Sequence, residues 1–282
     1  MNYRHAFHAG NFADVVKHTI LTRIIDYLMR KDAAFRVIDT HAGVGIYDLF
    51  GDKAERTGEW RDGIGRVMAA ELPAPVAELL SPYLAAIRAQ NPEGDLRYYP
   101  GSPFITRHML REQDRLMAFE LHPMDANRLK ENFAGDFQTR ITQLDAWDIF
   151  GTHLPPKEKR GLVLVDPPFE EKGEFTRMVQ GLEKAHKRWP GGTYAFWYPI
   201  KEPEEVEAYV KALKRTGIPK ILRLELTIRA PSAPPRLHGT GMVVVNPPFV
   251  LEEEMRKVLP VLAELLSDEG RGRWSVDWVA GE

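Results

Sequence analysis

Four short apolar runs that each end at an acidic residue constrain the fold of this chain more than any other feature. They cover residues 35–39, 116–120, about 141–145 and 162–166, and they end at Asp39, Glu120, Asp145 and Asp166. The last three acids are 25 and 21 residues apart, and each gap holds one helix-sized segment, such as 123–133. Strand–helix units of this length build a parallel sheet whose polar strand ends meet at one edge. The sequence therefore predicts an α/β fold.

The rest of the chain extends this pattern at both ends. Asn11 is a good N-cap, and apolar residues at three- and four-residue spacing predict a helix over about 12–30. After Asp166 we expect helices near 173–189 and 203–215, and strands near 193–198, 220–229 and 241–246. The last two strands lie too close for a helical crossover, so they are expected to pair as an antiparallel hairpin at the sheet edge. The prediction is a seven-stranded, mostly parallel sheet with a reversed edge strand.

One gap in the pattern is too long. Asp39 and Glu120 are 81 residues apart, where about 20 would be expected between neighbouring strand ends. The segment 48–97 has turn-rich ends and two helix-like stretches, so it is predicted to be an inserted helical subdomain. The core is then discontinuous and comprises residues 1–47 and 98–282.

Composition excludes several classes of protein. The 282 residues include no cysteine, which rules out disulfides, thiolate zinc sites, iron–sulfur clusters and a thiol nucleophile. No apolar run reaches 18 residues and the first residues lack the apolar core of a secretory signal, so a cytoplasmic protein is expected. The formal charge of −2 argues against a protein that coats nucleic acid by bulk charge, but it leaves room for a local basic face.

The turn from Asp39 to Gly45 follows a strand, and Gly43 and Gly45 would let the backbone approach a ligand closely. By itself it can equally be a tight strand–helix turn. Glu120 ends the next strand, where it could accept hydrogen bonds from ribose hydroxyls, and Asp145 follows one strand later. Together they suggest an adenosine-bearing cofactor, although an acid at a strand end can also cap the next helix.

The most specific signal is Asp166-Pro167-Pro168-Phe169 directly after an apolar strand. Two prolines end the strand and would project the Asp166 carboxylate and the Pro167 carbonyl from the sheet edge. Two such acceptors suit an exocyclic amino group, because hydrogen bonds to both of its N–H groups localise the nitrogen lone pair. Phe169 could then stack on the base that carries this amino group.

A second copy, Asn246-Pro247-Pro248-Phe249, also follows an apolar run. Asp166 ends the fourth core strand, beside the first in a doubly wound sheet and so at the switch-point crevice, whereas Asn246 is expected to end the last strand at the edge. We therefore interpret the second copy as a strand terminator.

Longer strings identify a family. They are Tyr3-Arg4-His5-Ala6-Phe7-His8-Ala9-Gly10-Asn11-Phe12-Ala13-Asp14-Val15-Val16-Lys17-His18, Asp39-Thr40-His41-Ala42-Gly43, Arg56-Thr57-Gly58-Glu59, Tyr98-Tyr99-Pro100-Gly101-Ser102-Pro103, Arg111-Glu112-Gln113-Asp114 and Thr193-Tyr194-Ala195 with Trp197-Tyr198-Pro199. With the Asp-Pro-Pro-aromatic motif, the chain resembles the 23S rRNA (adenine(2030)-N6)-methyltransferase family (RlmJ) over essentially its whole length.

This resemblance implies a Rossmann-like class I methyltransferase that uses S-adenosyl-L-methionine, yields S-adenosyl-L-homocysteine and needs no metal. It places the cofactor contacts at His18, His41, Gly43, Ser102, Glu120, Asp145, Ala146 and Asp166. Asp166 would accept the proton, with Pro167 and Phe169 beside it, and Tyr3, Lys17 and Phe169 would face the substrate. The implied partner is 23S rRNA, free or in an early assembly particle, with no membrane and no obligatory protein partner.

Two positions depart from the family pattern. Phe169 stands where the family often has tyrosine, and Ala146 where a glycine commonly follows the acid. Phe169 keeps the stacking face and loses only a hydroxyl, so activity is expected to survive, whereas Ala146 bears on the contact with the cofactor base.

Basic and aromatic side chains along the chain are candidates for RNA contacts. Arginine and lysine could bind phosphates or form a solvated face, and Tyr98 and Tyr99 could stack on RNA or pack in the core. The candidate cations are Arg4, Lys17, Arg23, Arg107, Arg111 and Arg115.

Three other functions fit parts of the pattern. A DNA adenine-N6 methyltransferase shares the chemistry, but the chain shows no evident target-recognition domain. A protein-glutamine methyltransferase also uses an Asn-Pro-Pro-aromatic turn. A noncatalytic RNA-binding module predicts RNA affinity without cofactor binding.

Overall fold

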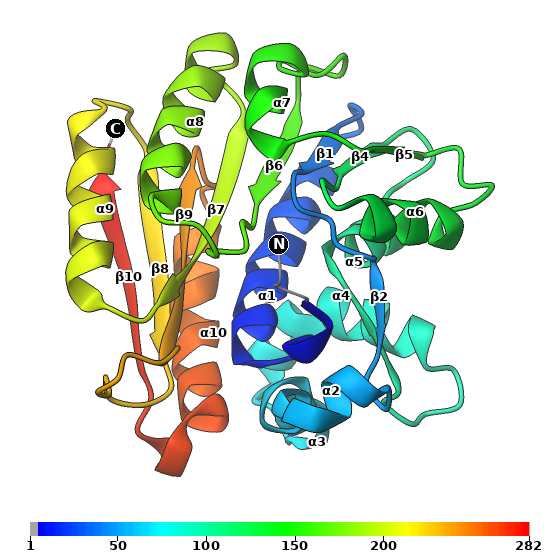
Figure 1. Ribbon diagram of the computed structural model, residues 1–282, viewed down its shortest axis with the longest axis vertical. Coiled ribbons are helices and arrows are strands. Elements are labelled where there is room, and N and C mark those ends of the chain that lie inside the picture. The colour runs from blue at the N-terminus through cyan, green and yellow to red at the C-terminus, as the bar shows by residue number, and fades with distance from the viewer. Residues whose placement is uncertain (1–4, 282) are drawn as a thin grey trace.

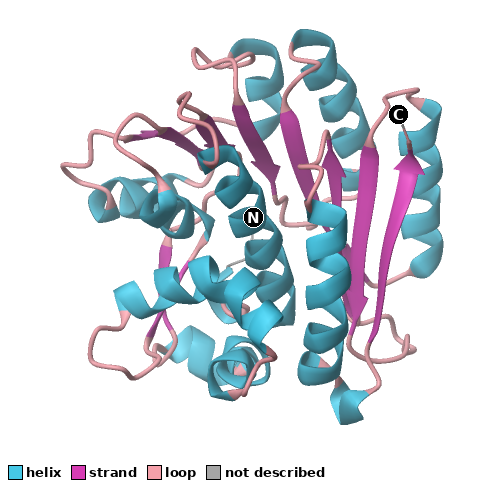
Figure 2. Cartoon of the chain, turned by 180° about the vertical axis from the view of Figure 1, so that it is seen from behind, coloured by secondary structure: helices cyan, strands magenta, loops and turns pink. Residues whose placement is uncertain are grey.

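The computed structural model of the protein describes residues 5–281. It consists of a mixed eight-stranded sheet with helices on both faces (Figures 1 and 2). The strand order is β10-β8-β9-β7-β6-β1-β4-β5. Five neighbouring strands are parallel: β1 (Arg36–Asp39), β4 (Arg115–Phe119), β5 (Thr139–Thr142), β6 (Gly161–Val165) and β7 (Thr193–Ile200). The remaining three, each antiparallel to its neighbours, are β8 (Ile221–Thr227), β9 (Gly239–Val245) and β10 (Arg273–Ala280). The α/β fold class is confirmed.

The two faces of the sheet are covered by different helices, because alternate residues of a strand point to opposite faces. Leu162 and Leu164 of β6 pack with α1 (Phe12–Met29), α4 (Ala74–Gln90), α5 (Ser102–Met109), α6 (Pro123–Asn132) and α10 (Leu251–Leu266). Val163 and Val165 pack with α7 (Ala146–Thr152), α8 (Glu174–Arg188) and α9 (Pro203–Arg215). Both cores leave the carboxyl ends of the parallel strands at one edge.

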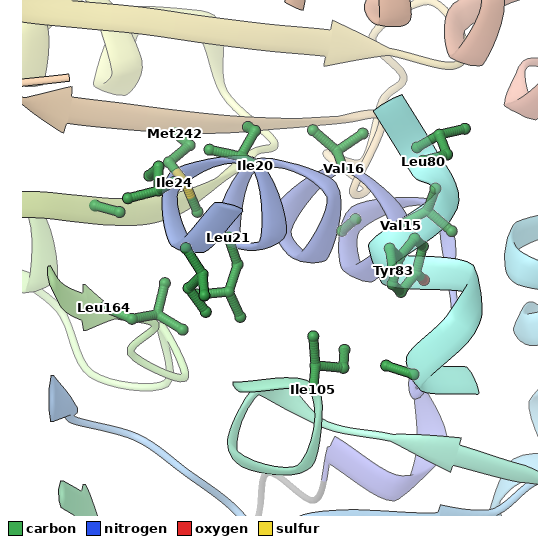
Figure 3. Close-up of a cluster of buried hydrophobic side chains, with 14 of the residues drawn as sticks. Val15, Val16, Ile20, Leu21, Ile24, Leu80, Tyr83, Ile105, Leu164 and Met242 are labelled. Carbon is green, nitrogen blue, oxygen red and sulfur yellow. The ribbon is translucent and has the colours of Figure 1, made fainter. Parts of the chain in front are cut away.

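Helix α1 lies at the centre of the first core. Figure 3 shows its apolar side chains between Leu80 and Tyr83 of α4, Ile105 of α5, Leu164 of β6 and Met242 of β9. The helix begins as predicted, since the Asn11 side chain accepts hydrogen bonds from the Ala13 and Asp14 N–H groups. Neighbours on several sides bury even the polar residues of its first turns, among them Asp14, Lys17 and His18.

The predicted seven-stranded sheet is wrong in two respects. β10 is an eighth strand and forms the edge, and β9 lies inside the sheet between β7 and β8. Burial explains the order: every residue of β9 is buried, as expected for a strand covered on both faces, whereas β10 exposes half of its residues. The antiparallel pairing of β8 with β9 is confirmed.

The segment predicted to be an insertion is helical. Between the paired strands β2 (Ile46–Asp48) and β3 (Tyr98–Pro100) it holds α2 (Asp52–Thr57), a helical turn at Arg61–Gly65, α3 (Arg66–Ala69) and α4. Its buried side chains share one hydrophobic core with α1 and α10. The division of the chain into a core and a subdomain stays a prediction.

Short helical turns at His5–Phe7 and Asp268–Gly270 complete the secondary structure. Within residues 5–281, no helix is both long and apolar enough to cross a bilayer.

Candidate active site

A cavity of about 540 Å³ opens at the carboxyl edge of the parallel strands. This volume lies within the range of small-molecule sites, about 300–1,000 Å³. Ten of the residues predicted to form the site line it: Lys17, His18, His41, Gly43, Ser102, Glu120, Asp145, Ala146, Asp166 and Pro167. Phe169 does not line it, and Tyr3 lies outside the described residues.

The glycine turn and Glu120 are joined directly. The Gly43 N–H donates to Oε2 of Glu120 at 2.9 Å, and the His122 N–H donates to Oε1 at 2.8 Å. Gly43 has φ +60°, which favours glycine, and a Cβ there would lie 2.4 Å from the Tyr47 hydroxyl, so any other residue would also have to displace that side chain. Burial raises the pKa of Glu120, and the two N–H groups oppose this shift. The acid therefore ties the turn to the start of α6 and still faces the cavity.

Asp145 and Ala146 form the adjoining wall at the start of α7. The Asp145 side chain accepts a hydrogen bond from the Trp147 N–H at 2.9 Å, which makes it the N-cap of this helix. The Trp147 indole lies edge-on to the His41 ring, with centroids 6.0 Å apart. Burial lowers the pKa of His41 to about 4, so this imidazole is neutral at physiological pH.

Beneath the cavity lies a buried acid. The Asp39 side chain is fully buried at the end of β1, and burial, with the nearby charge of Asp166, raises its pKa to about 7. The Ser102 hydroxyl and the His41 N–H oppose this shift. Within the described chain, Oδ2 of Asp39 has no hydrogen-bond partner. A carboxyl with so little compensation is held partly protonated near neutral pH.

Ser102 and His18 come from two helices that meet at the cavity. Ser102 is the first residue of α5, and His18 lies in α1. The His18 Nδ1 is 2.7 Å from the Tyr99 hydroxyl, which is 2.9 Å from the Tyr83 hydroxyl. Tyr99 is fully buried in this chain of contacts, so of the two open interpretations it takes the packing role.

Lys17 and Asp166 form the most polar contact of the site. The Lys17 Nζ lies 2.5 Å from Oδ2 of Asp166 and 2.8 Å from Oδ1 of Asp14. Burial alone would lower the pKa of Lys17, but the two carboxylates outweigh it and raise the pKa. A protonated lysine thus holds one oxygen of Asp166, whose side chain is 15% exposed. Pro167 follows at the cavity wall.

Phe169 has an aromatic environment outside the cavity. Its ring lies edge-on to Phe175 and Trp197, with centroids 5.0 and 6.0 Å away. Its φ of +51° is rare for a residue with a side chain. Trp197 in turn lies 5.7 Å from the Lys17 Nζ, so this aromatic group borders the Lys17–Asp166 pair. Stacking of Phe169 on a base stays a prediction.

The second motif lies at the opposite end of the strands, where the parallel strands begin. β9 runs antiparallel to β7, and Val245 pairs with Tyr194 near the start of β7. The Asn246 side chain donates to the carbonyls of Pro190 and Gly192, and it does not line the cavity. The expectation that Asn246 ends an edge strand is wrong, but strand direction separates it from Asp166 all the same.

Carboxylates dominate the charge of the cavity. Seven acids line it against two cations, Lys17 and Arg177; the acids are Glu120, Asp125, Asp145, Asp166, Glu170, Glu171 and Glu174. A buried oxygen of Glu174, Oε1, has no hydrogen-bond partner in the described structure. An acidic wall with an unmatched acceptor fits a cationic ligand that carries N–H or O–H donors, as S-adenosylmethionine does. Within residues 5–281, no three potential ligands cluster as a metal site.

Sequence reasoning missed several lining residues, including Tyr47, Leu121, Trp147, Glu174 and Arg177. Trp147 and Leu121 directly follow predicted site residues, which is a signal that could have found them. Glu174 and Arg177 sit at the start of α8, and only the packing of that helix brings them to the cavity.

The candidate phosphate-binding arginines are mostly occupied within the protein. Arg23 pairs with Glu254 at 2.8 Å, Arg107 with Asp136 at 2.6 Å and Arg111 with Asp114 at 2.7 Å. Arg115 donates to the backbone carbonyls of Glu112 and Asp114, and Arg4 lies outside the described residues. These side chains serve the fold.

Comparisons with known proteins match most or all of the chain. The family model described as "RsmJ: Ribosomal RNA large subunit methyltransferase D, RlmJ" matches residues 32–280. Curated relatives from Haemophilus influenzae and Escherichia coli K12, each named Ribosomal RNA large subunit methyltransferase J, are 43% identical to the chain, and the alignments cover 100% of the chain and of each relative. The crystal structure of protein LPL1258 from Legionella pneumophila superposes with a TM-score of 0.87 at 32% identity, covering 96% of this chain and 98% of that one.

Proposed function

Because the chain belongs to the RlmJ family of ribosomal RNA large subunit methyltransferases, we propose that it methylates the N6 amino group of adenine 2030 in 23S rRNA. It is an rRNA methyltransferase with the Rossmann-like fold of the class that uses S-adenosyl-L-methionine. The specific base and the mechanism are the parts that we propose.

The observation that carries the proposal is the pairing of Lys17 with Asp166 at a cavity lined by carboxylates. Lys17 donates to Oδ2 of Asp166, so the other oxygen, Oδ1, would accept the hydrogen bond from an amino group. The rigid Pro167 carbonyl beside it supplies a second acceptor. Two acceptors on one exocyclic amino group suit adenine N6.

Several residues fit the cofactor. The Glu120 carboxylate would accept from the ribose hydroxyls, and Asp145 and Ala146 would contact the adenine of the cofactor. His18, His41, Gly43 and Ser102 complete the cofactor contacts, and the acidic lining favours positive charge. When bound, S-adenosylmethionine would supply an electrophilic methyl carbon on a sulfonium for transfer to the amino nitrogen, with S-adenosylhomocysteine as the leaving group.

The main contributions of the protein are the positioning of the amino group and a proton acceptor. Holding the amino group against the cavity replaces a bimolecular encounter by an oriented one and excludes water. An aspartate is a weak base, so Asp166 takes the proton after the methyl group has moved, when the nitrogen is cationic and strongly acidic. Lys17 keeps the carboxylate oriented through its short contact. Phe169 would turn from Phe175 and Trp197 to stack on the target base.

The test is methyl transfer from labelled S-adenosylmethionine to protein-free 23S rRNA from cells that lack this modification. Assembled large subunits and duplex DNA are assayed in parallel, and the products are digested to nucleosides. The proposal expects N6-methyladenosine at one site in the free rRNA. Label in DNA alone would make the protein a DNA adenine methyltransferase. Activity that persists on protein after RNA removal would point to glutamine methylation, which the position of Asn246 away from the cavity disfavours. RNA affinity without any cofactor binding would leave only an RNA-binding module.

A further inference from the structure

Charge is distributed unevenly between the two ends of the parallel strands. At the carboxyl end, seven acids and two cations line the cavity. At the amino end lie the segments 153–160, 183–192 and 211–220, which directly precede β6, β7 and β8. These three segments hold ten lysines and arginines and two acids, although the whole chain has a formal charge of −2. We call their surface the basic face.

Hydrogen bonds join the three segments into one surface. The Arg188 Nε donates to the Leu154 carbonyl at 2.9 Å, which ties the second segment to the first. The Asn246 side chain donates to the Pro190 carbonyl at 2.7 Å, and the Asn246 N–H donates to the Lys220 carbonyl at 2.9 Å. Figure 1 shows the carboxyl ends of α8 and α9 at the upper edge of the molecule. The second proline motif therefore holds the basic face together.

Most cations of the basic face have no partner in the protein. Glu158, the acid of the first segment, pairs with Arg36 of β1 at 2.8 Å and so neutralises none of the lysines around it. The other acid, Glu183, is exposed on α8. Six exposed lysines make no hydrogen bond or ion pair within residues 5–281: Lys157, Lys159, Lys184, Lys187, Lys211 and Lys214.

The ends of the helices explain only part of this charge. Both α8 and α9 have basic residues in the last turn, where a cation stabilises the helix dipole by about 0.3–1 kcal/mol. Lys184 and Lys211 lie before these last turns, and Lys157 and Lys159 lie in the loop before β6. The fold therefore uses fewer cations than this face carries.

The active-site end lacks the free positive charge that an RNA needs. Affinity for RNA depends on cations that neutralise phosphates and release their counterions. The cavity is acidic, and Arg23, Arg107 and Arg111 are each paired with an acid of the fold. The basic face, by contrast, offers several unpaired lysines close together. A polyanionic substrate would gain its electrostatic affinity there.

We propose that the basic face binds the phosphate backbone of a second segment of the rRNA, while the target adenine lies in the cavity at the other end of the strands. β6 has five residues and spans about 17 Å, so the face and Asp166 are separated by about that distance. A large folded RNA presents many helices, and two of its segments can occupy both ends. Lysines that contact phosphates hold the RNA without reading its sequence. The inference goes beyond the proposed function, because it assigns a second RNA-binding surface.

Two double variants test the proposal. One combines Lys157→Gln with Lys159→Gln in the loop before β6, and the other combines Lys187→Gln with Lys214→Gln at the ends of α8 and α9. Each removes two positive charges from exposed, unpaired side chains, so the fold is expected to be unaffected. Glutamine keeps the length and the helix propensity of lysine.

The matched control removes two positive charges elsewhere, by Arg256→Gln with Lys257→Gln. Both side chains are exposed on α10 and already pair with acids of the same helix, Glu252 at 2.9 Å and Glu253 at 2.7 Å. Binding is measured at several salt concentrations with full-length, protein-free 23S rRNA. It is measured again with a short fragment that holds the target adenine and a few flanking nucleotides.

Each double variant of the basic face should reduce the slope of log affinity against log salt for full-length rRNA by about 1.4–1.8. This is the loss of two phosphate contacts at about 0.7–0.9 each, and it corresponds to binding weakened on the order of tenfold at physiological salt. The control should match the wild type. Binding and methylation of the short fragment should be the same in all variants, because this fragment cannot reach the basic face.

Two results would overturn the inference. Variants of the basic face that keep the wild-type salt slope on full-length rRNA would leave this face to a partner other than RNA. An equal loss of affinity for the short fragment would show that the lysines act by long-range attraction and not by contact. Failure of the proposed function would be recognised separately, because the wild-type protein would then form no N6-methyladenosine in rRNA that it still binds.

Discussion

Replacing Asp39 by asparagine should make the protein more stable at neutral pH, and by an amount that depends on pH. Asp39 is fully buried, one of its oxygens has no partner in the described structure, and its pKa of about 7 lies well above the ordinary value of 3.8. A raised pKa means that the folded state binds the proton more tightly than the unfolded state. The contribution to stability is therefore complete below about pH 4 and is lost as the pH rises through 7.

The size of the effect follows from the same two values. The full difference in pKa corresponds to about 4 kcal/mol, of which about 2.5 kcal/mol is lost between pH 5 and pH 8. Asparagine has the shape of the protonated acid and does not titrate, so the variant lacks this loss. The free energy of unfolding of Asp39→Asn minus that of the wild type should thus grow by about 2.5 kcal/mol over this range.

Urea unfolding, followed by circular dichroism at intervals from pH 5 to pH 8, measures this difference. Comparing the two proteins at each pH cancels the titration of the groups that do not interact with Asp39. A difference that stays constant across the range would refute the reasoning, because it would mean that Asp39 is ionised in the folded protein throughout. A difference that shrinks with rising pH would reverse the sign of the linkage.

Three further predictions concern the site. Lys17→Met leaves the buried carboxylate of Asp14 without its cation and should lower the free energy of unfolding in urea by about 3–5 kcal/mol. The double variant with Asp14→Asn should recover part of this lost stability. An unchanged urea midpoint for Lys17→Met would contradict the buried pairing. Asp166→Ala should abolish methyl transfer to rRNA while calorimetry still detects cofactor binding, and Asn246→Ala should keep turnover; the reverse pattern would assign the chemistry to the second motif. Gly43→Ala should destabilise the protein by more than the roughly 1–2 kcal/mol of a left-handed residue and weaken cofactor binding, whereas Gly135→Ala, also at positive φ but with no atom within 4 Å of the added Cβ, should show only that conformational cost. Equal thermal shifts of the two glycine variants would show that the contact with Tyr47 is unimportant.

Much of the fold could be predicted from local patterns. Helix α1, strands β1, β4 to β9 and helices α6, α8 and α9 all have the apolar spacing that the prediction used, and each was placed within a few residues. The failures involve pairing. The apolar run at Gly239–Val245 was recognised as a strand, but nothing local shows that it inserts between β7 and β8. Strand β10 was missed because only Val276 and Val279 of its residues are buried, and they pack into the cores on opposite faces of the sheet, so the strand lacks a regular apolar alternation.

The residues of the candidate site likewise fall into those that local sequence patterns predict and those that only packing brings together. Residues at the ends of parallel strands, such as Glu120 and Asp166, were predictable, because parallel strands bring their carboxyl ends to one edge. The contact of Lys17 with Asp166 joins residues 149 positions apart, and the sequence placed Lys17 only beside the site. Glu174 and Arg177 were missed because α8 brings them to the cavity by packing.

Residue types and their spacing were enough to predict the strand–helix repeats, the acids at the strand ends, the proline turn after β6 and the family. These features depend on a few neighbouring positions in the chain. Four other features became visible only in the folded protein: the order of the last three strands, the end of the sheet at which Asn246 lies, the burial that raises the pKa of Asp39 and the pairing of Lys17 with two acids. Each of these features depends on contacts between segments that are far apart in the sequence. Burial and the direction of the strands set the energies of these contacts.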